Sequence, residues 1–293
     1  MLIGLGLKLE HLTQEALQAI KSCDSVFLEK YTLDVDYNLG ALTKLTNKEI
    51  KLLERKDVET FSFFPSKENN NPAQKDFHSE TFQNNNSAQK IPLPGANKNN
   101  ISAQKTTSLK TNQNFALLVF GDPLIATTHT ELILEAKQRG IETKIIHNIS
   151  ILDVISRTGL QPYKFGKTTS IPFWQENIEY KPLGFYNVLE QNLSIGAHTL
   201  FLLDPNQQDN KNLTPNRAIE MLREAEAMRK KGAISDETLF IVCCRICSKT
   251  EKIVVSKYDK IKSIDFGAPP FCLIVPAQTH FKEQEFLDEF VVS

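Results

Sequence analysis

Four short segments combine glycine, carboxylate, hydroxyl and imidazole groups, and each directly follows an apolar run that could form a strand. They are residues 4–7, 121–129, 147–151 and 203–204. In proteins that alternate strands and helices, ligands bind beyond the carboxyl ends of parallel strands and between domains. We therefore expect the four segments to meet at one ligand-binding site.

The most specific of these segments is GDPLIATTHTEL, residues 121–132. Glycine gives the backbone freedom after the strand and proline fixes the turn, so Asp122 is held at the carboxyl edge of the sheet. There its carboxylate could accept hydrogen bonds or face a cation. Thr127 and Thr128 lie near the start of the next helix, and we expect either of them to cap it. A plain strand-to-helix turn with a capping aspartate is the simpler alternative.

The pair Gly4-x-Gly6 is a weaker signal. It lacks the third glycine of the dinucleotide-binding fingerprint, and Glu29, the acidic residue nearest to the expected ribose position, is a single coincidence. NAD binding is therefore not expected. Close packing of a helix on the strand explains the two glycines equally well.

The five cysteines indicate neither a disulfide framework nor a metal site. Their number is odd, and three of them cluster at residues 243, 244 and 247. The spacing Cys244-x-x-Cys247 provides half of a zinc site, but no second pair accompanies it. Cys243 lies in an apolar run, where cysteine packs as a small hydrophobic residue. We expect a reduced protein without a bound metal.

Alternating strands and helices must position these segments. The first half predicts strands at residues 2–7, 26–29, 50–53, 115–120 and 141–147, and helices from the N-cap Thr13 to residue 21, at 39–45 and at 130–139. Gly140 follows the last helix, where a left-handed residue is favoured. Continuous apolar strands interleaved with amphipathic helices predict a parallel-rich sheet covered on both faces.

The second half continues the alternation. It predicts an extended segment at residues 165–173, strands at 198–203, 238–243, 252–256 and 271–275, and helices at 183–195, 215–231 and 283–290. Thr214 is the expected N-cap of the helix that begins with Pro215. The fold class is therefore α/β, with one α/β domain at residues 1–149, a second at residues 150–293, and a ligand-binding cleft between them.

Between about residues 66 and 114 the composition changes abruptly. Eleven of these 49 residues are Asn, and the phrase NPAQK, NSAQK or ISAQK ends at Lys75, Lys90 and Lys105. Each unit offers too few apolar side chains to offset a backbone ordering cost of roughly 1–2 kcal/mol per residue. We expect a disordered polar insertion within the N-terminal domain. A partner-binding tail that uses the three lysines is the alternative.

Composition excludes several classes of protein. The chain has 293 residues, 34 Lys and Arg against 35 Asp and Glu, and a net charge of −1. A nucleic-acid coat or a membrane-surface protein would carry a basic excess. No apolar run reaches about 18 residues, and the N-terminus lacks the regions of a signal peptide. We expect a cytoplasmic protein that binds neither nucleic acid nor membrane.

Six motifs in order carry a resemblance to a known family. They are IGLGL at 3–7, GDPLIATTH at 121–129, IHNISI at 146–151, TGLQPYKFGK at 158–167, HTLFLLD at 198–204 and DFGAPP at 265–270. In these motifs the chain resembles the tetrapyrrole methylase family of S-adenosylmethionine-dependent methyltransferases. The phrase YKFGK is typical of one branch, which modifies translation elongation factor 2. The likeness covers nearly the whole chain except the insertion.

The resemblance implies two α/β domains with the methyl donor bound in the cleft between them, in a protein that works as a homodimer. It implies that a histidine of elongation factor 2 carrying a 3-amino-3-carboxypropyl group is methylated on its amine, on the route to diphthamide, with S-adenosylhomocysteine as product. The positions that match the family's cofactor contacts are Leu7, Asp122, Ile125, Ser150, Ile151, Leu203 and Ile246, and Phe271 replaces a histidine.

Methyl transfer from a sulfonium needs no metal and no covalent nucleophile. Alignment of the two reactants can supply roughly 7–11 kcal/mol of the barrier. The attacking amine must be neutral, so a proton acceptor or a path to solvent is required. The sequence names no such base. His129 and His147 are more typical of structural hydrogen bonding, and Asp122 is expected to position the cofactor.

Two departures from the family leave alternatives open. Ile246 stands where the family has a smaller residue and could crowd the adenine pocket, whereas Phe271 cannot donate the hydrogen bond of a histidine. The alternatives are a related methyltransferase that acts on a tetrapyrrole or an RNA, and a non-catalytic interaction protein with a degenerate cofactor pocket. Affinity for S-adenosylmethionine separates the last of these from the enzymes.

Overall fold

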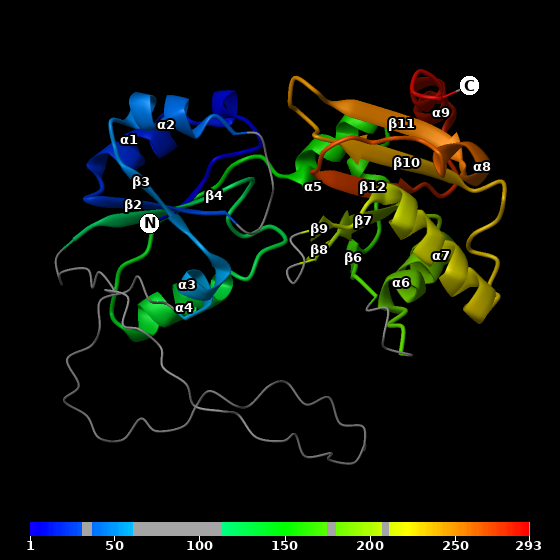
Figure 1. Cartoon of the computed structure of the whole chain (residues 1–293), viewed down its shortest axis with the longest axis horizontal. Helices are drawn as coiled ribbons and strands as arrows, with labels where there is room; N and C mark the ends of the chain where they lie inside the picture. Colours follow the sequence, from blue (N-terminus) through cyan, green and yellow to red (C-terminus); the bar gives the residue numbers. More distant parts are fainter. Residues whose placement is uncertain (31–36, 61–112, 175–179, 207–210, 293) are drawn as a thin grey trace, which may run out of the picture.

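The computed structural model describes residues 1–30, 37–60, 113–174, 180–206 and 211–292. The interval predicted as a disordered polar insertion, with its three repeats, lies outside these residues except for its last two. The described chain forms two five-stranded sheets side by side, each covered by helices on both faces (Figure 1). The α/β class is therefore confirmed, while the domain boundary at residue 150 stays a prediction.

The first sheet is built only from parallel strands. Its strands are β1 (Leu2–Gly4), β2 (Ser25–Glu29), β3 (Ile50–Leu53), β4 (Phe115–Val119) and β5 (Ile145–Ile146). They lie in the order β3-β2-β4-β1-β5. The carboxyl ends of β4, β1 and β5 are therefore neighbours, and the glycine and carboxylate segments identified in the sequence follow these three ends.

Alternation along the strands divides the first core between two faces. Ile3 and Leu118 pack against the helices of one face, which are α1 (Gln14–Ser22) and α2 (Leu39–Thr46). Leu2 and Leu117 pack on the other face, against α3 (Arg55–Glu59) and α4 (Thr130–Gln138). A strand buried on both faces must be apolar throughout, and this requirement explains the continuous apolar runs.

The second sheet has a different topology. Its strands are β6 (Thr169–Ile171), β7 (Thr199–Leu203), β10 (Leu239–Cys244), β11 (Lys252–Lys257) and β12 (Phe271–Val275), in the order β11-β10-β12-β7-β6. Only β6 and β7 are parallel, and the other three pairs are antiparallel. The parallel-rich sheet predicted from the first half of the chain therefore has no counterpart in this half, for which the sequence predicted no strand direction. The connection from β10 to β11 is too short for a parallel crossover, which needs a dozen residues or more.

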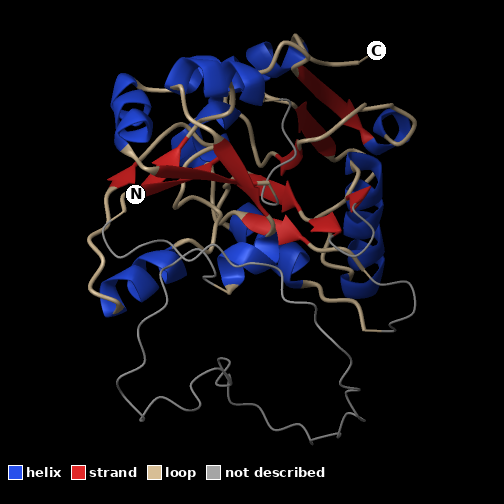
Figure 2. Ribbon diagram, turned by 60° about the vertical axis from the view of Figure 1, so that its left-hand side comes forward, coloured by secondary structure: helices blue, strands red, loops and turns tan. Residues whose placement is uncertain are grey.

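Helices also cover both faces of the second sheet (Figure 2). They are α5 (Ile151–Val154), α6 (Gly184–Ser194), α7 (Pro215–Arg229), α8 (Tyr258–Ile261) and α9 (Phe281–Asp288). Short 3₁₀ turns lie elsewhere in the chain, at Leu9–His11, Ile155–Thr158 and Pro162–Lys164. The strands β8 (Pro205–Asn206) and β9 (Lys211–Asn212) form a small separate hairpin. Helices α6, α7 and α8 contribute to one core and α5 and α9 to the other. No helix within the described residues is both long and apolar enough to cross a membrane.

Several predicted ends are confirmed by hydrogen bonds. Thr13 and Thr214 cap α1 and α7, because their side chains accept from the backbone N–H groups of Ala16 and Arg217. Gly140 follows α4 with a φ of +71°. Other boundaries are wrong. The strands predicted at 2–7 and 141–147 are shorter, and α7 ends at Arg229, before the predicted residue 231.

The YKFGK motif ties the second sheet to the last helix. Glu283, at the first turn of α9, is 1% exposed. Its carboxylate accepts hydrogen bonds from the Lys164 ammonium, from the backbone N–H of Gln161 at 2.9 Å and from that of His280 at 2.7 Å. Lys164 therefore has a structural role, whereas the neighbouring Tyr163 is 81% exposed.

A buried histidine completes this network. His198 Nδ1 accepts a hydrogen bond from the Ala277 N–H at 3.0 Å, so its proton lies on Nε2 and points at Glu283, 3.3 Å away. Burial opposes the charged form of Glu283, but the hydrogen bonds from Lys164, the backbone and His198 outweigh it and lower the pKa of Glu283 to about 2. Burial lowers the pKa of His198, which fits the neutral ring.

The lowered pKa of Glu283 predicts a loss of stability in acid. The stabilising charge is complete above the ordinary pKa of 4.5 and is lost as the pH falls towards 2. We expect Glu283→Gln to cost about 2–4 kcal/mol of unfolding free energy at pH 7 and to remove this acid dependence. Urea unfolding at a series of pH values measures both effects. The exposed Glu285 on the same helix provides the control Glu285→Gln, and equal pH profiles for wild type and Glu283→Gln would contradict the prediction.

Candidate functional site

A cavity of about 740 Å³ opens where the carboxyl ends of β1 and β4 face the second sheet. Both halves of the chain line it. The first sheet contributes the segments after β1, β4 and β5, and the second contributes β6, the end of β7 and the ends of β10 and β12. Its volume lies in the range of about 300–1,000 Å³ that is typical of small-molecule sites.

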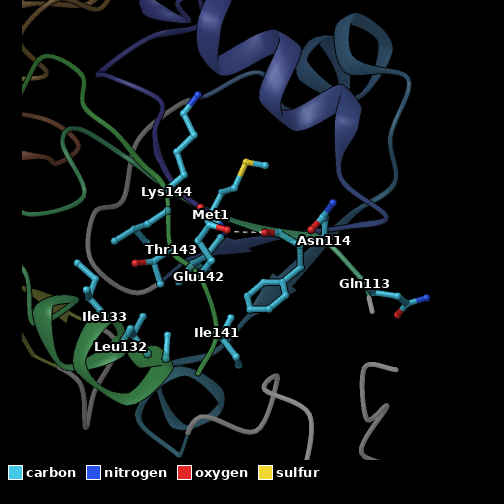
Figure 3. Close-up of a pocket in the computed structure, with 13 residues that line it drawn as sticks. Met1, Gln113, Asn114, Leu132, Ile133, Ile141, Glu142, Thr143 and Lys144 are labelled. Atoms are coloured by element: carbon cyan, nitrogen blue, oxygen red, sulfur yellow. Dashed lines mark hydrogen bonds between the residues drawn. The ribbon is translucent and has the colours of Figure 1, made fainter. Parts of the chain in front are cut away.

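A second cavity, of about 300 Å³, lies at the opposite end of the first sheet (Figure 3). Met1, Phe115 and Lys144 line it, so it opens at the amino ends of the strands. The Met1 ammonium there donates to the Phe115 carbonyl at 2.7 Å. Ligands of parallel sheets bind at the carboxyl ends. The larger cavity is therefore the candidate site.

Asp122 connects two of the loops that surround the larger cavity. Its carboxylate is 3% exposed and accepts from the Leu124 N–H at 2.9 Å, within its own loop. It also accepts from the Asn148 N–H at 3.0 Å and contacts His147 Nδ1 at 2.8 Å, both in the loop after β5. The carboxylate therefore fixes the backbone on which the loop after β4 and the loop after β5 present their other residues.

The loop after β1 joins the same assembly by close packing. The Asn148 side-chain amide donates to the carbonyls of Gly4 at 2.9 Å and His11 at 3.1 Å. A Cβ atom at Gly4 would lie 2.7 Å from the Gly121 carbonyl and 2.9 Å from the Asn148 Cβ, so a larger residue would displace both loops. Gly4 is thus required for contact between loops, and not for packing of a helix on the strand.

A buried ion pair contacts the loop after β4. Glu29, at the end of β2, and His129, at the N-cap of α4, are separated by 2.8 Å between Oε2 and Nε2. The other ring nitrogen, Nδ1, donates to the Pro123 carbonyl at 2.9 Å. Both ring nitrogens thus face acceptors, which the imidazolium form satisfies. Burial opposes this charge, but Glu29 and the Pro123 carbonyl outweigh it and raise the pKa of His129.

The expected threonine caps of α4 are wrong. His129 occupies the N-cap without a capping side-chain bond, and the Thr127 hydroxyl donates back to the Pro123 carbonyl at 2.7 Å. Thr127 and His129 thus both bind the Pro123 carbonyl, and these two contacts fix the conformation of the loop after β4. Both threonines remain exposed to the cavity as part of its lining.

On the opposite wall, Arg245 fixes the loop that contains DFGAPP. Its guanidinium donates to the Phe266 carbonyl at 2.9 Å, to the Ala268 carbonyl and to the Thr250 carbonyl at 3.1 Å. Arg245 follows β10 in a left-handed conformation, with a φ of +48°. The backbone therefore turns sharply at this residue and presents Ile246 to the cavity.

The structure brings all eight sequence-predicted cofactor positions to the same cavity. They are Leu7, Asp122, Ile125, Ser150, Ile151, Leu203, Ile246 and Phe271. Ile246 and Phe271 line the cavity without filling it. Of the two histidines considered, His129 belongs to the lining, whereas His147 does not. Contact of these residues with a cofactor stays a prediction.

Sequence reasoning missed several residues of the site. Glu29 was considered only as a ribose ligand, although it is the buried partner of His129. Asn148 connects two loops, and Arg55 and Ser170 line the cavity. Their position at the end of an apolar run was the available signal for Asn148 and Glu29, but the Asn148 contact with Gly4 spans 144 residues of sequence and the Glu29 contact with His129 spans 100.

Comparison with known proteins agrees with this geometry. The family described as Tetrapyrrole (Corrin/Porphyrin) Methylases matches residues 1–262. A diphthine synthase of Methanothermobacter thermautotrophicus is 34% identical over 98% of this chain and 94% of its own. A protein of Arabidopsis thaliana named as a probable diphthine methyl ester synthase is 30% identical over 98% and 96%. A solved diphthine synthase structure superimposes with a TM-score of 0.72 at 27% identity, over 99% of this chain and 96% of the other.

The buried pair of Glu29 and His129 predicts a specific dependence on pH. Because the folded state raises the pKa of His129 above its ordinary value of 6.5, the pair stabilises the fold at lower pH and loses this contribution as the pH rises through the raised pKa. The difference in unfolding free energy between wild type and His129→Gln should therefore shrink towards alkaline pH. Nitrogen NMR of the ring follows its protonation directly. A ring that loses its proton below pH 6.5 would contradict the prediction.

Proposed function

We propose that this chain, which belongs to the tetrapyrrole methylase family, is a diphthine synthase that uses the larger cavity. The relatives that match nearly its full length are diphthine synthases. In this function it transfers methyl groups from S-adenosylmethionine to the amine of the 3-amino-3-carboxypropyl group on a histidine of translation elongation factor 2. The observation that carries the proposal is the convergence of the eight family positions, from both halves of the chain, on one cavity.

The cavity has the size and lining that S-adenosylmethionine requires. It combines apolar side chains such as Ile125 and Leu203 with hydroxyl and charged groups, and it remains open beside Ile246 and Phe271. When bound, the cofactor supplies a methyl group that is activated by its own positive charge. The residues of the chain bind and orient it and exclude water from the reacting atoms. An open cavity favours an enzyme over a non-catalytic protein with a degenerate pocket.

In this function Asp122 supports cofactor binding indirectly, by fixing the backbone of the loops after β4 and β5. Its carboxylate is occupied by hydrogen bonds within the protein, so its contribution is to hold the loops that carry Ile125 and Ser150 in place. Ser150 is itself fixed, because its hydroxyl donates to Asp153 at 2.7 Å and accepts from the Leu152 N–H at 3.2 Å. This arrangement is preorganised before the cofactor arrives, which reduces the entropy lost on binding.

Two further parts of the proposal rest on the resemblance and not on the geometry of the cavity. We propose that the enzyme works as a homodimer in the cytoplasm, where its protein substrate acts in translation. Neither a nucleic acid nor a membrane is needed for this function. Light scattering coupled to gel filtration measures the oligomeric state.

Cofactor binding is the first test. We expect calorimetry to detect micromolar binding of S-adenosylmethionine to the wild type, about −8 kcal/mol. Asp122→Asn should weaken it about tenfold or more, since the new amide group cannot accept from both backbone N–H groups and also from His147. Asp236 is exposed, paired with Arg223 and not part of the cavity lining, so Asp236→Asn provides the control. No binding to the wild type would mean that the cavity is not a cofactor site.

Methyl transfer is the second test. Elongation factor 2 that carries the 3-amino-3-carboxypropyl group should gain methyl groups when incubated with the enzyme and S-adenosylmethionine. Mass spectrometry counts the methyl groups, and mild alkaline hydrolysis distinguishes an ester from a methylated amine. Unmodified elongation factor 2 is the matched control and should gain none. Cofactor binding without transfer to the modified factor would favour a related methyltransferase with another acceptor.

A further inference from the structure

The lining of the larger cavity contains few groups that could exchange a proton with a substrate. The titratable side chains in it are Arg55, Asp122, His129, Asp204, Cys243, Arg245 and Cys272. The proposed function requires such a group or a path to solvent, because an amine must lose a proton before each methyl transfer. The hydrogen-bond partners of each residue show which of them is available for this role.

Asp122 and His129 are already engaged. The Asp122 carboxylate is 3% exposed and has contacts with two backbone N–H groups and with His147. His129 is 1% exposed, and both of its ring nitrogens lie within hydrogen-bond distance of oxygen atoms of the protein. Neither residue can accept a further proton without breaking the contacts that fix the loop after β4.

The remaining groups, except one, are unsuited by their chemistry. Arg55 and Arg245 are cations and cannot accept a proton near neutral pH. Cys243 is buried and lies beside Cys272 on the neighbouring strand. The contact with Cys272 and burial raise the pKa of Cys243 well above its ordinary value, so this thiol stays protonated.

Asp204 differs from all of them. It follows β7 directly, at the edge of the second sheet that faces the loop after β4, and it is only partly buried. Among the described residues, the hydroxyl of Ser170 on the adjacent strand β6 is a hydrogen-bond donor to its carboxylate. An ionised carboxylate offers about four lone-pair sites. Because Asp204 lines the cavity, the accepting capacity that Ser170 does not use is available to a ligand bound there.

We propose that Asp204 is the carboxylate that receives the amino group of the substrate and accepts its proton as each methyl group is transferred. This inference rests on the proposed function, because it assigns a role toward the amine of the modified histidine. Burial raises the pKa of Asp204, and the Ser170 hydroxyl opposes that change. The charged groups that line the same cavity are Arg55, Asp122, His129 and Arg245.

The step is balanced in atoms and charge. The substrate enters as an ammonium group, attracted by the Asp204 carboxylate, and transfers one proton to it. The freed lone pair forms the nitrogen–carbon bond to the methyl group while the carbon–sulfur bond breaks, and the electron pair of that bond stays on sulfur. Asp204 then releases its proton to solvent. The methylated product is again an ammonium group, and it can undergo the same cycle as long as its nitrogen still carries a proton.

Asp204→Asn is the decisive variant, since it keeps the shape of the side chain and removes its charge. We expect kcat on modified elongation factor 2 to fall about 100-fold or more, the usual contribution of an acid–base group. The Kd of S-adenosylmethionine should change less than about twofold. Binding of the modified factor in the presence of S-adenosylhomocysteine should also weaken, which is a readout independent of turnover. Asp204→Glu retains the carboxylate and should recover part of the activity.

The pH profile separates a proton acceptor from a structural residue. In Asp204→Asn the rate should rise steadily towards alkaline pH, where solvent removes the proton, and the variant should approach the wild type. A variant that keeps the wild-type kcat and pH profile would overturn the inference, as would loss of S-adenosylmethionine binding. A wild type that binds the cofactor but does not methylate the modified factor would overturn the proposed function and this inference together. Asp236→Asn removes an exposed carboxylate outside the cavity lining and is the control, which should keep the wild-type kcat and pH profile.

Discussion

The hydrogen bonds of one buried carboxylate hold the candidate site together. Asp122 accepts from its own loop and from the loop after β5, and Asn148 in that second loop reaches the carbonyl of Gly4 after β1. Three neighbouring strand ends are thereby fixed relative to one another. Because a buried carboxylate without partners would be strongly unfavourable, these contacts cannot be exchanged freely with water. The shape of this wall of the cavity therefore depends on the fold of the whole first sheet.

The two walls of the cavity are built on different physical principles. The first wall consists of loops after parallel strands, braced by Asp122 and by the buried pair of Glu29 and His129. The second wall consists of the ends of a mostly antiparallel sheet, with Arg245 holding the DFGAPP loop by hydrogen bonds to its carbonyls. The first wall has its charges tied up internally, whereas the second leaves Asp204 accessible. Under the proposed function both walls contribute to the cofactor site, and the accessible carboxylate on the second wall is left for the acceptor.

Local signals in the sequence predict the elements well and their arrangement less well. Helix α7 could be located because Thr214 and Pro215 act within one turn, and the strand at Ile50–Leu53 was bounded correctly because apolar residues end abruptly there. The antiparallel second sheet could not be predicted from periodicity, because an apolar strand buried on both faces has the same pattern in either direction. The eight cofactor positions came from motif resemblance. Glu29 and His129 lie 100 residues apart, so only the completed fold brings them together.

The place where the chain enters β4 has a consequence for how this protein can change over generations. Asn114 lies at the amino end of that strand, held by the backbone of Asp24 at 2.7 Å, whereas the cavity lies at the carboxyl end. The entropy of closing a loop grows only with the logarithm of its length, so that doubling the loop costs about 0.6 kcal/mol. A longer chain before Asn114 therefore costs little extra entropy to close, and it enters the sheet at the end away from the cavity. The carboxyl end of the same strand has no such freedom, because Phe120, Gly121 and Asp122 there line the cavity and a change in length would move them.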